Sequence, residues 1–285
     1  MNSVVTIGTF DGVHRGHKEV LKEVLDIAHK QNFKPVAVTF DRHPLEIVAP
    51  ERAPKMLMGA DSRDSRLRAE GLDVVRIPFT DDVRRVTAAQ WMRRLRDEQG
   101  MRVLVLGYDN SFGSDGSRLS LDDYRRIGES LGIDVVRVEA LPGCSSSAAR
   151  SAVTNGDMPQ AAGILGRPFS ISGEVIHGRQ LGRTIGVPTA NLKIARRQLL
   201  PKTGVYAAEA ILPDGSRKRA VVNVGDNPTV ESDGKTRVEA HICDFDGDLY
   251  GETITINFKR RIRGERRFDS LANLQARIRR DIAEA

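Results

Sequence analysis

The chain has 285 residues, of which 40% are hydrophobic and 29% charged, and its formal net charge is +6. This is the profile of a soluble globular protein with room for two domains, and the lack of any run of about 18 apolar residues excludes a membrane-spanning helix. The mixed basic charge is compatible with phosphate-bearing ligands, and the two distant cysteines, Cys144 and Cys243, lack metal-ligand spacing.

Residues 8–17, with the sequence GTFDGVHRGH, lie between a strand pattern and a helix pattern. The uncharged β-branched run before them predicts a short buried strand, and the apolar spacing after them predicts a helix that begins near Gly16. A helix N-terminus offers unpaired N–H groups and a positive dipole end to phosphate oxygens. Gly16 would let phosphates approach the backbone, and His14 and His17 can donate hydrogen bonds to charge that develops there.

The first half continues as an alternation of strand and helix patterns. The predicted strands are 35–40, 102–107 and 134–138, and the predicted helices are 88–99 and 121–131. Such βαβ alternation predicts a parallel, doubly wound α/β sheet, which binds ligands beyond the carboxyl ends of its strands.

Polar segments follow two of these strands at that predicted ligand edge, TFDRHP at 39–44 and GYDNSFG at 107–113, and a third polar segment is SSSAAR at 145–150. Arg150 could clamp phosphates bidentately, and the serines before it could cap the next helix. Each segment alone is equally typical of an ordinary turn, cap or surface.

The motif at 8–17 resembles the HxGH signature of the nucleotidyltransferase superfamily, and with the three polar segments it resembles bacterial flavin adenylyltransferase domains. The resemblance implies attack on the α-phosphate of a nucleoside triphosphate, with His14 and His17 catalytic and pyrophosphate leaving. Asn110 and Ser111 depart from the family's aromatic-plus-polar pair. The remaining residues that the resemblance assigns to ligand binding are Gly8, Phe10, Asp11, Gly16, Asp109, Ser146 and Arg150.

The second half changes to short alternating runs without helices between them. The predicted strands are 170–176, 204–212, 218–224, 237–245 and 252–258. They favour an antiparallel barrel or sandwich, followed by a helix that Asp269 or Ser270 caps and that carries an apolar stripe. We therefore expect two domains, residues 1–165 and 166–285.

Residues 173–191, GEVIHGRQLGRTIGVPTAN, combine glycines and arginines in a loop whose N–H groups could wrap phosphate oxygens. Thr189 and Asn191 would face the same side of an extended segment, and their oxygens suit Mg²⁺. A kinase also needs a group that orients and deprotonates the attacking hydroxyl, for which Glu239 is the best candidate. Periodicity alone favours a solvated strand face for Glu239.

This segment resembles riboflavin kinase, together with GVY at 204–206, VNVGDNPT at 222–229, VEAH at 238–241, DLYG at 248–251 and RGERRF at 263–268. The chain as a whole thus resembles the bacterial bifunctional riboflavin kinases/FAD synthetases. The resemblance implies that Glu239 is the base that acts on the ribityl 5′-hydroxyl and that Thr189 and Asn191 hold Mg–ATP. The other implied ligand-binding residues are Gly178, Arg183, Arg263, Glu265 and Phe268.

The function that this resemblance implies is phosphorylation of riboflavin to FMN by ATP, followed by adenylylation of FMN to FAD with release of pyrophosphate. The expected ligands are ATP, Mg²⁺, riboflavin, FMN and FAD, in a cytoplasmic protein without a leader segment. We expect no membrane, nucleic-acid or obligate protein partner. Three alternatives stay open: a kinase with a weak or inactive adenylyltransferase domain, a flavin-responsive RNA-binding regulator, and a nucleotidyltransferase with another acceptor.

Overall fold

The computed structural model describes residues 1–178, 186–226, 236–266 and 268–285. They form two compact units, Met1–Ser146 and Ser147–Ala285. The predicted boundary at 165/166 stays a prediction.

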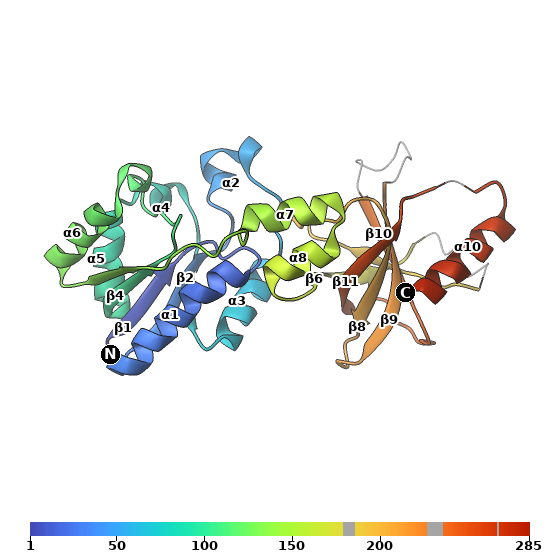
Figure 1. Ribbon diagram of the computed structural model, residues 1–285, viewed down its shortest axis with the longest axis horizontal. Helices are drawn as coiled ribbons and strands as arrows, with labels where there is room; N and C mark the ends of the chain where they lie inside the picture. Colours follow the sequence, from blue (N-terminus) through green and yellow to red (C-terminus); the bar gives the residue numbers. More distant parts are fainter. Residues whose placement is uncertain (179–185, 227–235, 267) are drawn as a thin grey trace. The chain divides into compact units, whose positions relative to one another are not determined.

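The first unit is built on a five-stranded parallel sheet in the order β3-β2-β1-β4-β5 (Figure 1). Its strands are β1 (Ser3–Ile7), β2 (Lys34–Phe40), β3 (Asp73–Ile77), β4 (Met101–Leu106) and β5 (Asp134–Arg137). The chain order reverses between β1 and β4, so the carboxyl end of β1 lies at the topological switch point where such sheets bind ligands. The predicted doubly wound class is confirmed, although β3 was not predicted.

Helices cover both faces of this sheet because successive strand residues point to opposite sides. Val4 packs in a cluster with Leu21 of α1 (Arg15–Gln31) and Leu67 of α3 (Ala60–Ala69). Val5 packs in the other cluster, with Trp91 of α5 (Ala88–Gln99) and with residues of α6 (Leu121–Leu131). Shorter helical turns occur at α2 (Leu45–Val48), η1 (Pro50–Arg52), α4 (Asp81–Arg85) and η2 (Gly116–Arg118).

The helix ends follow local chemistry that the sequence carries. Thr87 and Gln90 form a capping box at the start of α5, and Ser120 and Asp123 form another at the start of α6. Both predicted helices therefore begin and end where the pattern places them. The polar helix α3 has no such pattern and was missed, because two of its three buried residues are the charged Arg63 and Asp64, which form an ion pair at 2.9 Å.

The second unit contains a closed antiparallel barrel in the order β10-β7-β6-β11-β8-β9. Helices α7 (Ser146–Asn155) and α8 (Met158–Leu165) precede the barrel, and α10 (Leu271–Glu284) follows it. Ser270 caps α10 as one of the two predicted candidates, and α10 packs on β8 and β9. The strands are β6 (Phe169–Ile176), β7 (Ala190–Lys193), β8 (Gly204–Ile211), β9 (Arg217–Asp226), β10 (Thr236–Ile242) and β11 (Thr253–Arg263).

Alternation along the barrel strands decides which face carries polar side chains. Val222, Val238 and Ala240 are fully buried and fill the inside of the barrel. Asn223 and Glu239, between them in the pleat, face outward on the side that α10 covers.

Candidate active sites

The GTFDGVHRGH motif forms a tight connection between β1 and α1. Three of its residues have a positive φ: Phe10 at 47°, Gly12 at 85° and Val13 at 39°. Phe10 and Val13 are not glycines, so this conformation is strained, and it persists only where the surroundings enforce it. Strain of this kind is concentrated at functional sites.

Two groups outside the motif hold this connection in place. The carboxylate of Asp11 is buried and accepts backbone hydrogen bonds from Leu57 at 3.0 Å and from Met58 at 3.3 Å. The Ser146 hydroxyl donates to the Asp11 carbonyl at 2.9 Å. Asp11 and Ser146, both predicted ligand-binding residues, thus contact each other and preorganise the turn between strand and helix.

The two motif histidines lie together at the N-terminus of α1. His14 is the N-cap, and its Nδ1 accepts a hydrogen bond from the backbone N–H of His17 at 3.2 Å. The two rings stack with centroids 3.6 Å apart, and Phe10 packs edge-on against His17 at 5.3 Å. Because Nδ1 of His14 accepts, Nε2 carries the proton of the neutral ring. The pair therefore places imidazole groups beside the N–H groups of the helix end.

The motif glycines Gly8 and Gly16 are close to other groups of the first unit. A Cβ on Gly16 would lie 2.7 Å from the Cys144 carbonyl and 3.2 Å from Nδ1 of His14. Gly16 therefore lets the 144–146 segment approach the start of α1, a packing role beside the predicted approach of phosphates. A Cβ on Gly8 would lie 3.3 Å from the Phe10 ring.

A cavity of about 560 Å³ opens at the carboxyl ends of this sheet and is lined by Gly8, Phe40, Phe79, Trp91, Asn110 and Ser111, among others. Asn110 also donates its side-chain amide to the carbonyl of Ile7. The two residues that depart from the family pattern thus lie on the cavity wall, whereas Asp109 is exposed at the turn before them. Arg150 lies on α7, in the second unit, and is half-buried.

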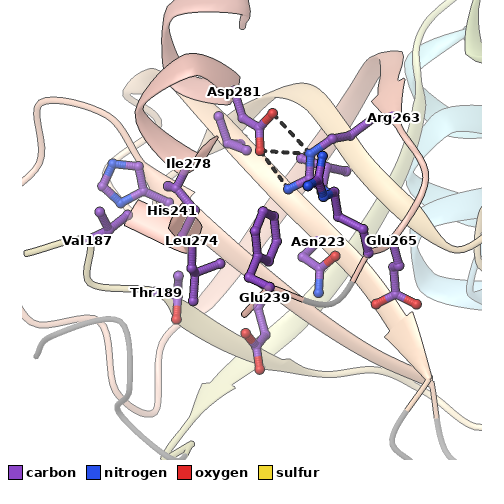
Figure 2. Close-up of a pocket in the computed structure, with 14 residues that line it drawn as sticks. Val187, Thr189, Asn223, Glu239, His241, Arg263, Glu265, Leu274, Ile278 and Asp281 are labelled. Atoms are coloured by element: carbon purple, nitrogen blue, oxygen red, sulfur yellow. Dashed lines mark hydrogen bonds and ion pairs between the residues drawn. The ribbon is translucent and has the colours of Figure 1, made fainter. Parts of the chain in front are cut away.

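The barrel carries a row of residues that are directly opposite one another across five strands. Glu239 on β10 pairs in register with Asn191 on β7 and with Asn223 on β9. Asn223 pairs with Val205 on β8, which pairs with Arg263 on β11. Opposite residues share one face of a sheet, so strand pairing brings predicted residues from three distant segments into one line. Figure 2 labels Asn223, Glu239 and Arg263 of this row.

A cavity of about 430 Å³ lies over this row, between the outer face of the barrel and α10 (Figure 2). The Glu239 side chain is 29% exposed, and its carboxylate forms an ion pair with Arg237 at 3.3 Å. The residues that line the cavity include Val187, Thr189, Val205, Asn223, Glu239, His241, Arg263, Glu265, Phe268, Leu274, Ile278 and Asp281. Thr189, Glu239, Arg263, Glu265 and Phe268, all predicted, therefore share one cavity.

An ion-pair cluster connects α10 to this cavity. Asp281 is 1% exposed and accepts hydrogen bonds from Arg263 at 2.7 Å (Figure 2) and from Arg277 at 2.9 Å. The guanidinium groups of Arg263 and Arg266 lie 5.8 and 4.9 Å from the centroid of the Phe268 ring. Arg263 thus holds the helix and orients an aromatic wall of the same cavity.

A second barrel cavity, of about 310 Å³, is lined by Pro188, Thr189, Asp246, Asp248 and Tyr250, among others. Thr189 lines both cavities. Asn191 is 9% exposed, and its carboxamide lies so close to the backbone of Gly178 that any side chain on Gly178 would displace it. Predicted Arg183 lies outside the described residues.

Four polar or charged residues of the larger barrel cavity were not predicted as site residues: Asn223, His241, Arg266 and Asp281. His241 follows Glu239 at the period of two that marks one strand face. Asp281 continues the helical spacing of Leu274 and Ile278. A carboxylate at an apolar position of a helix could therefore have marked Asp281 as a candidate site residue.

Two further observations bear on chemistry outside these sites. Cys144 and Cys243 are free thiols, and burial raises the pKa of the Cys243 thiol. Within the four described ranges, no helix is long and apolar enough to cross a membrane.

The first unit is a parallel α/β unit with a histidine pair at the start of α1, and the barrel that follows has two cavities that share Thr189, of which the larger contains Glu239. These features are those of a two-domain class of transferase. The family model described as FAD synthetase matches residues 1–151, and the one described as riboflavin kinase matches residues 165–285. The chain belongs to the family of bifunctional riboflavin kinases/FMN adenylyltransferases.

Individual relatives support this assignment over nearly the whole chain. The bifunctional riboflavin kinase/FMN adenylyltransferase of Pseudomonas fluorescens is 37% identical, with 99% of this chain and 91% of that protein covered. The protein of the same name from Escherichia coli K12 is 36% identical, with coverage of 98% and 90%. A crystal structure described as a macrolide-efflux protein from Streptococcus pneumoniae matches with a TM-score of 0.88 and 31% identity, with coverage of 98% and 92%.

Proposed function

We propose that this chain makes FAD from riboflavin in two ATP-dependent steps. The barrel phosphorylates riboflavin to FMN, and the parallel α/β unit transfers AMP from a second ATP to FMN. The observation that carries the kinase assignment is the position of Thr189 between two cavities, one of which also contains Glu239. A phosphoryl donor and a hydroxyl acceptor in neighbouring cavities could meet at that residue.

In the kinase step, riboflavin occupies the cavity under α10 and ATP occupies the smaller one. The apolar side chains of Val205, Leu274 and Ile278 suit a flavin ring, and Phe268 offers a face for stacking. Glu239 accepts the proton of the ribityl 5′-hydroxyl while the oxygen of that hydroxyl forms a bond to the γ-phosphorus of ATP. The bond between the γ-phosphorus and the β,γ-bridging oxygen breaks, and ADP leaves.

Thr189 and Asn191 are the residues that would hold Mg²⁺ with ATP. Both offer neutral oxygens, and the Asn191 side chain is fixed against the Gly178 backbone. Such a donor set fits Mg²⁺, which takes few protein ligands and keeps water and phosphate oxygens. When bound, the ion neutralises charge on the transferred phosphoryl group.

In the adenylyl step, a phosphate oxygen of FMN attacks the α-phosphorus of ATP, and the bond to the β-phosphate breaks with release of pyrophosphate. His14, His17 and the N–H groups at the start of α1 stabilise the charge that builds up there. The cavity lined by Trp91, Asn110 and Ser111 has a volume of about 560 Å³ and receives the flavin ring of FMN.

The adenylyl step is tested by incubating the protein with FMN, ATP and Mg²⁺. We expect equal amounts of FAD and pyrophosphate. Neither product would appear if the protein were a kinase alone. Parallel reactions with phosphopantetheine and nicotinamide mononucleotide test for another acceptor, and transfer to either of these in place of FMN would contradict the assignment.

We further propose a cytoplasmic enzyme that needs no nucleic-acid, membrane or obligate protein partner. Two free thiols are compatible with a reducing compartment. The basic run at 259–267 is the feature that favours an RNA-binding regulator as the alternative. RNA binding that weakens steeply with salt, in a protein without turnover, would support that alternative instead.

A further inference from the structure

A side-chain hydrogen bond continues the strand pairing between β7 and β10 beyond the last backbone pair. The ladder between these strands ends with Ala190 opposite Ala240. The next residue of β10, His241, places Nδ1 2.9 Å from the carbonyl oxygen of Pro188. A carbonyl only accepts hydrogen bonds, so Nδ1 of His241 carries a proton and donates it.

The segment that His241 contacts is the wall between the two barrel cavities. Val187 and Thr189 line the larger cavity, and Pro188 and Thr189 line the smaller one. Proline has no N–H, so its carbonyl is the one backbone group of Pro188 that can form a hydrogen bond. Figure 2 shows His241, Val187 and Thr189 around the larger cavity.

We propose that His241 is a positioning residue that places Thr189 for phosphoryl transfer by holding the carbonyl of Pro188. This inference rests on the proposed kinase function. Nδ1 of His241 bonds to the protein backbone, and the role of base belongs to Glu239. The function of His241 is therefore to fix the wall on which the two substrates meet.

Two substitutions distinguish the effect of losing the hydrogen bond to Pro188 from the effect of losing the imidazole ring. His241→Asn keeps an N–H donor near the position of Nδ1, whereas His241→Gln places its amide near the position of Nε2. Both remove the imidazole from the cavity wall. We expect His241→Asn to stay within about twofold of wild type in kcat/KM for Mg–ATP, and His241→Gln to lose about threefold to tenfold, the usual worth of one hydrogen bond.

Two measurements without turnover complete the test. Calorimetry should show weaker binding of Mg–ADP by His241→Gln than by His241→Asn, and hydrogen exchange in a peptide spanning residues 186–193 should be faster in His241→Gln. In the wild-type protein, nitrogen-15 shifts of the neutral His241 ring should report the Nδ1–H tautomer. That last measurement needs no variant to fold.

The kinase function and the role of His241 are contradicted by different results. A wild-type protein that makes no FMN would contradict the kinase function itself. If wild type makes FMN, equal behaviour of the two variants in kinetics and exchange would overturn the role of His241, as would an Nε2–H tautomer. Far-ultraviolet circular dichroism and the thermal unfolding curve of each variant report whether the barrel is folded, which conversion of FMN to FAD by the first unit cannot show.

Discussion

Glu239 is the residue on which the kinase proposal depends most. It stands between Asn191 and Asn223 in one cross-strand row and faces the cavity under α10. Its carboxylate forms an ion pair with Arg237 at 3.3 Å, so a positive charge lies beside it. The spacing of β10 makes this partner available, because Arg237 lies two residues away on the same face.

Replacement of Glu239 by Gln should lower the rate of FMN formation by roughly 100-fold or more, because an amide cannot accept the hydroxyl proton. Adenylylation of supplied FMN should stay near the wild-type rate. Both rates are measured by chromatography of the flavin products. Glu174→Gln is the matched control, since Glu174 is an exposed glutamate of β6 whose ion pair is with Lys193. Loss of both activities in folded Glu239→Gln would contradict the two-site assignment.

Replacement of His14 affects the stability of α1, whereas replacement of His17 tests its role in the reaction. His14 caps α1 and is 6% exposed, so its replacement removes a cap and destabilises the helix by about 1 kcal/mol. His17 is half-buried and lies within the first turn of α1. His17 is therefore the cleaner residue for a test of function.

His17→Ala should lower FAD formation from FMN by roughly 100-fold, because a donor to the reacting phosphates is removed. FMN formation from riboflavin should be unchanged in the same preparation. His29→Ala serves as the control, since His29 is an exposed histidine in the last turn of the same helix. A His17→Ala protein that makes FAD at the wild-type rate would remove His17 from the mechanism.

At the scale of the elements, strand β7 is positioned by the close approach of the Asn191 side chain to the backbone at Gly178. Gly178 lies directly against the carboxamide of Asn191, which stands in the cross-strand row with Glu239. A glycine is needed at position 178 because a Cβ would occupy the space of that carboxamide. The orientation of Asn191 is thus a property of two segments that meet in the barrel.

Gly178→Ala should therefore raise the KM for Mg–ATP in the kinase reaction by about tenfold and leave FMN adenylylation unchanged. The matched substitution is Gly163→Ala in α8, where a Cβ meets nothing within 4 Å. That control should keep both activities and raise the free energy of unfolding by up to about 1 kcal/mol, because alanine favours a helix. Equal kinetics for the two variants would show that Asn191 does not bind the nucleotide.

At the scale of the whole molecule, periodicity and caps predicted the two fold types, with helices 88–99 and 121–131 matching α5 and α6. The predicted antiparallel barrel is confirmed, although periodicity alone left a sandwich open. The order of the parallel strands was not predictable, because it depends on pairing between distant segments. Glu239 illustrates this point. Its strand pattern allowed a solvated face, and only the register with Asn191 and Asn223 shows which polar residues surround it.

The role of α10 in the site was also not predictable, because it depends on a contact between segments that are distant in the sequence. Its apolar stripe predicted a helix packed on the protein but could not show that this helix covers the outer face of the barrel. Asp281 joins Arg263 there, and the cavity between them exists only once helix and barrel are folded together. The residues of this cavity thus come from the segment before β7, from β8, β9, β10 and β11, from the segment after β11, and from α10.

The most direct test of the whole account is a time course of the products formed from riboflavin and excess Mg–ATP by the purified protein. We predict that FMN rises first and then falls as FAD accumulates, with one ADP and one pyrophosphate released for each FAD. Accumulation of FMN as the final product, without pyrophosphate, would contradict the two-step account.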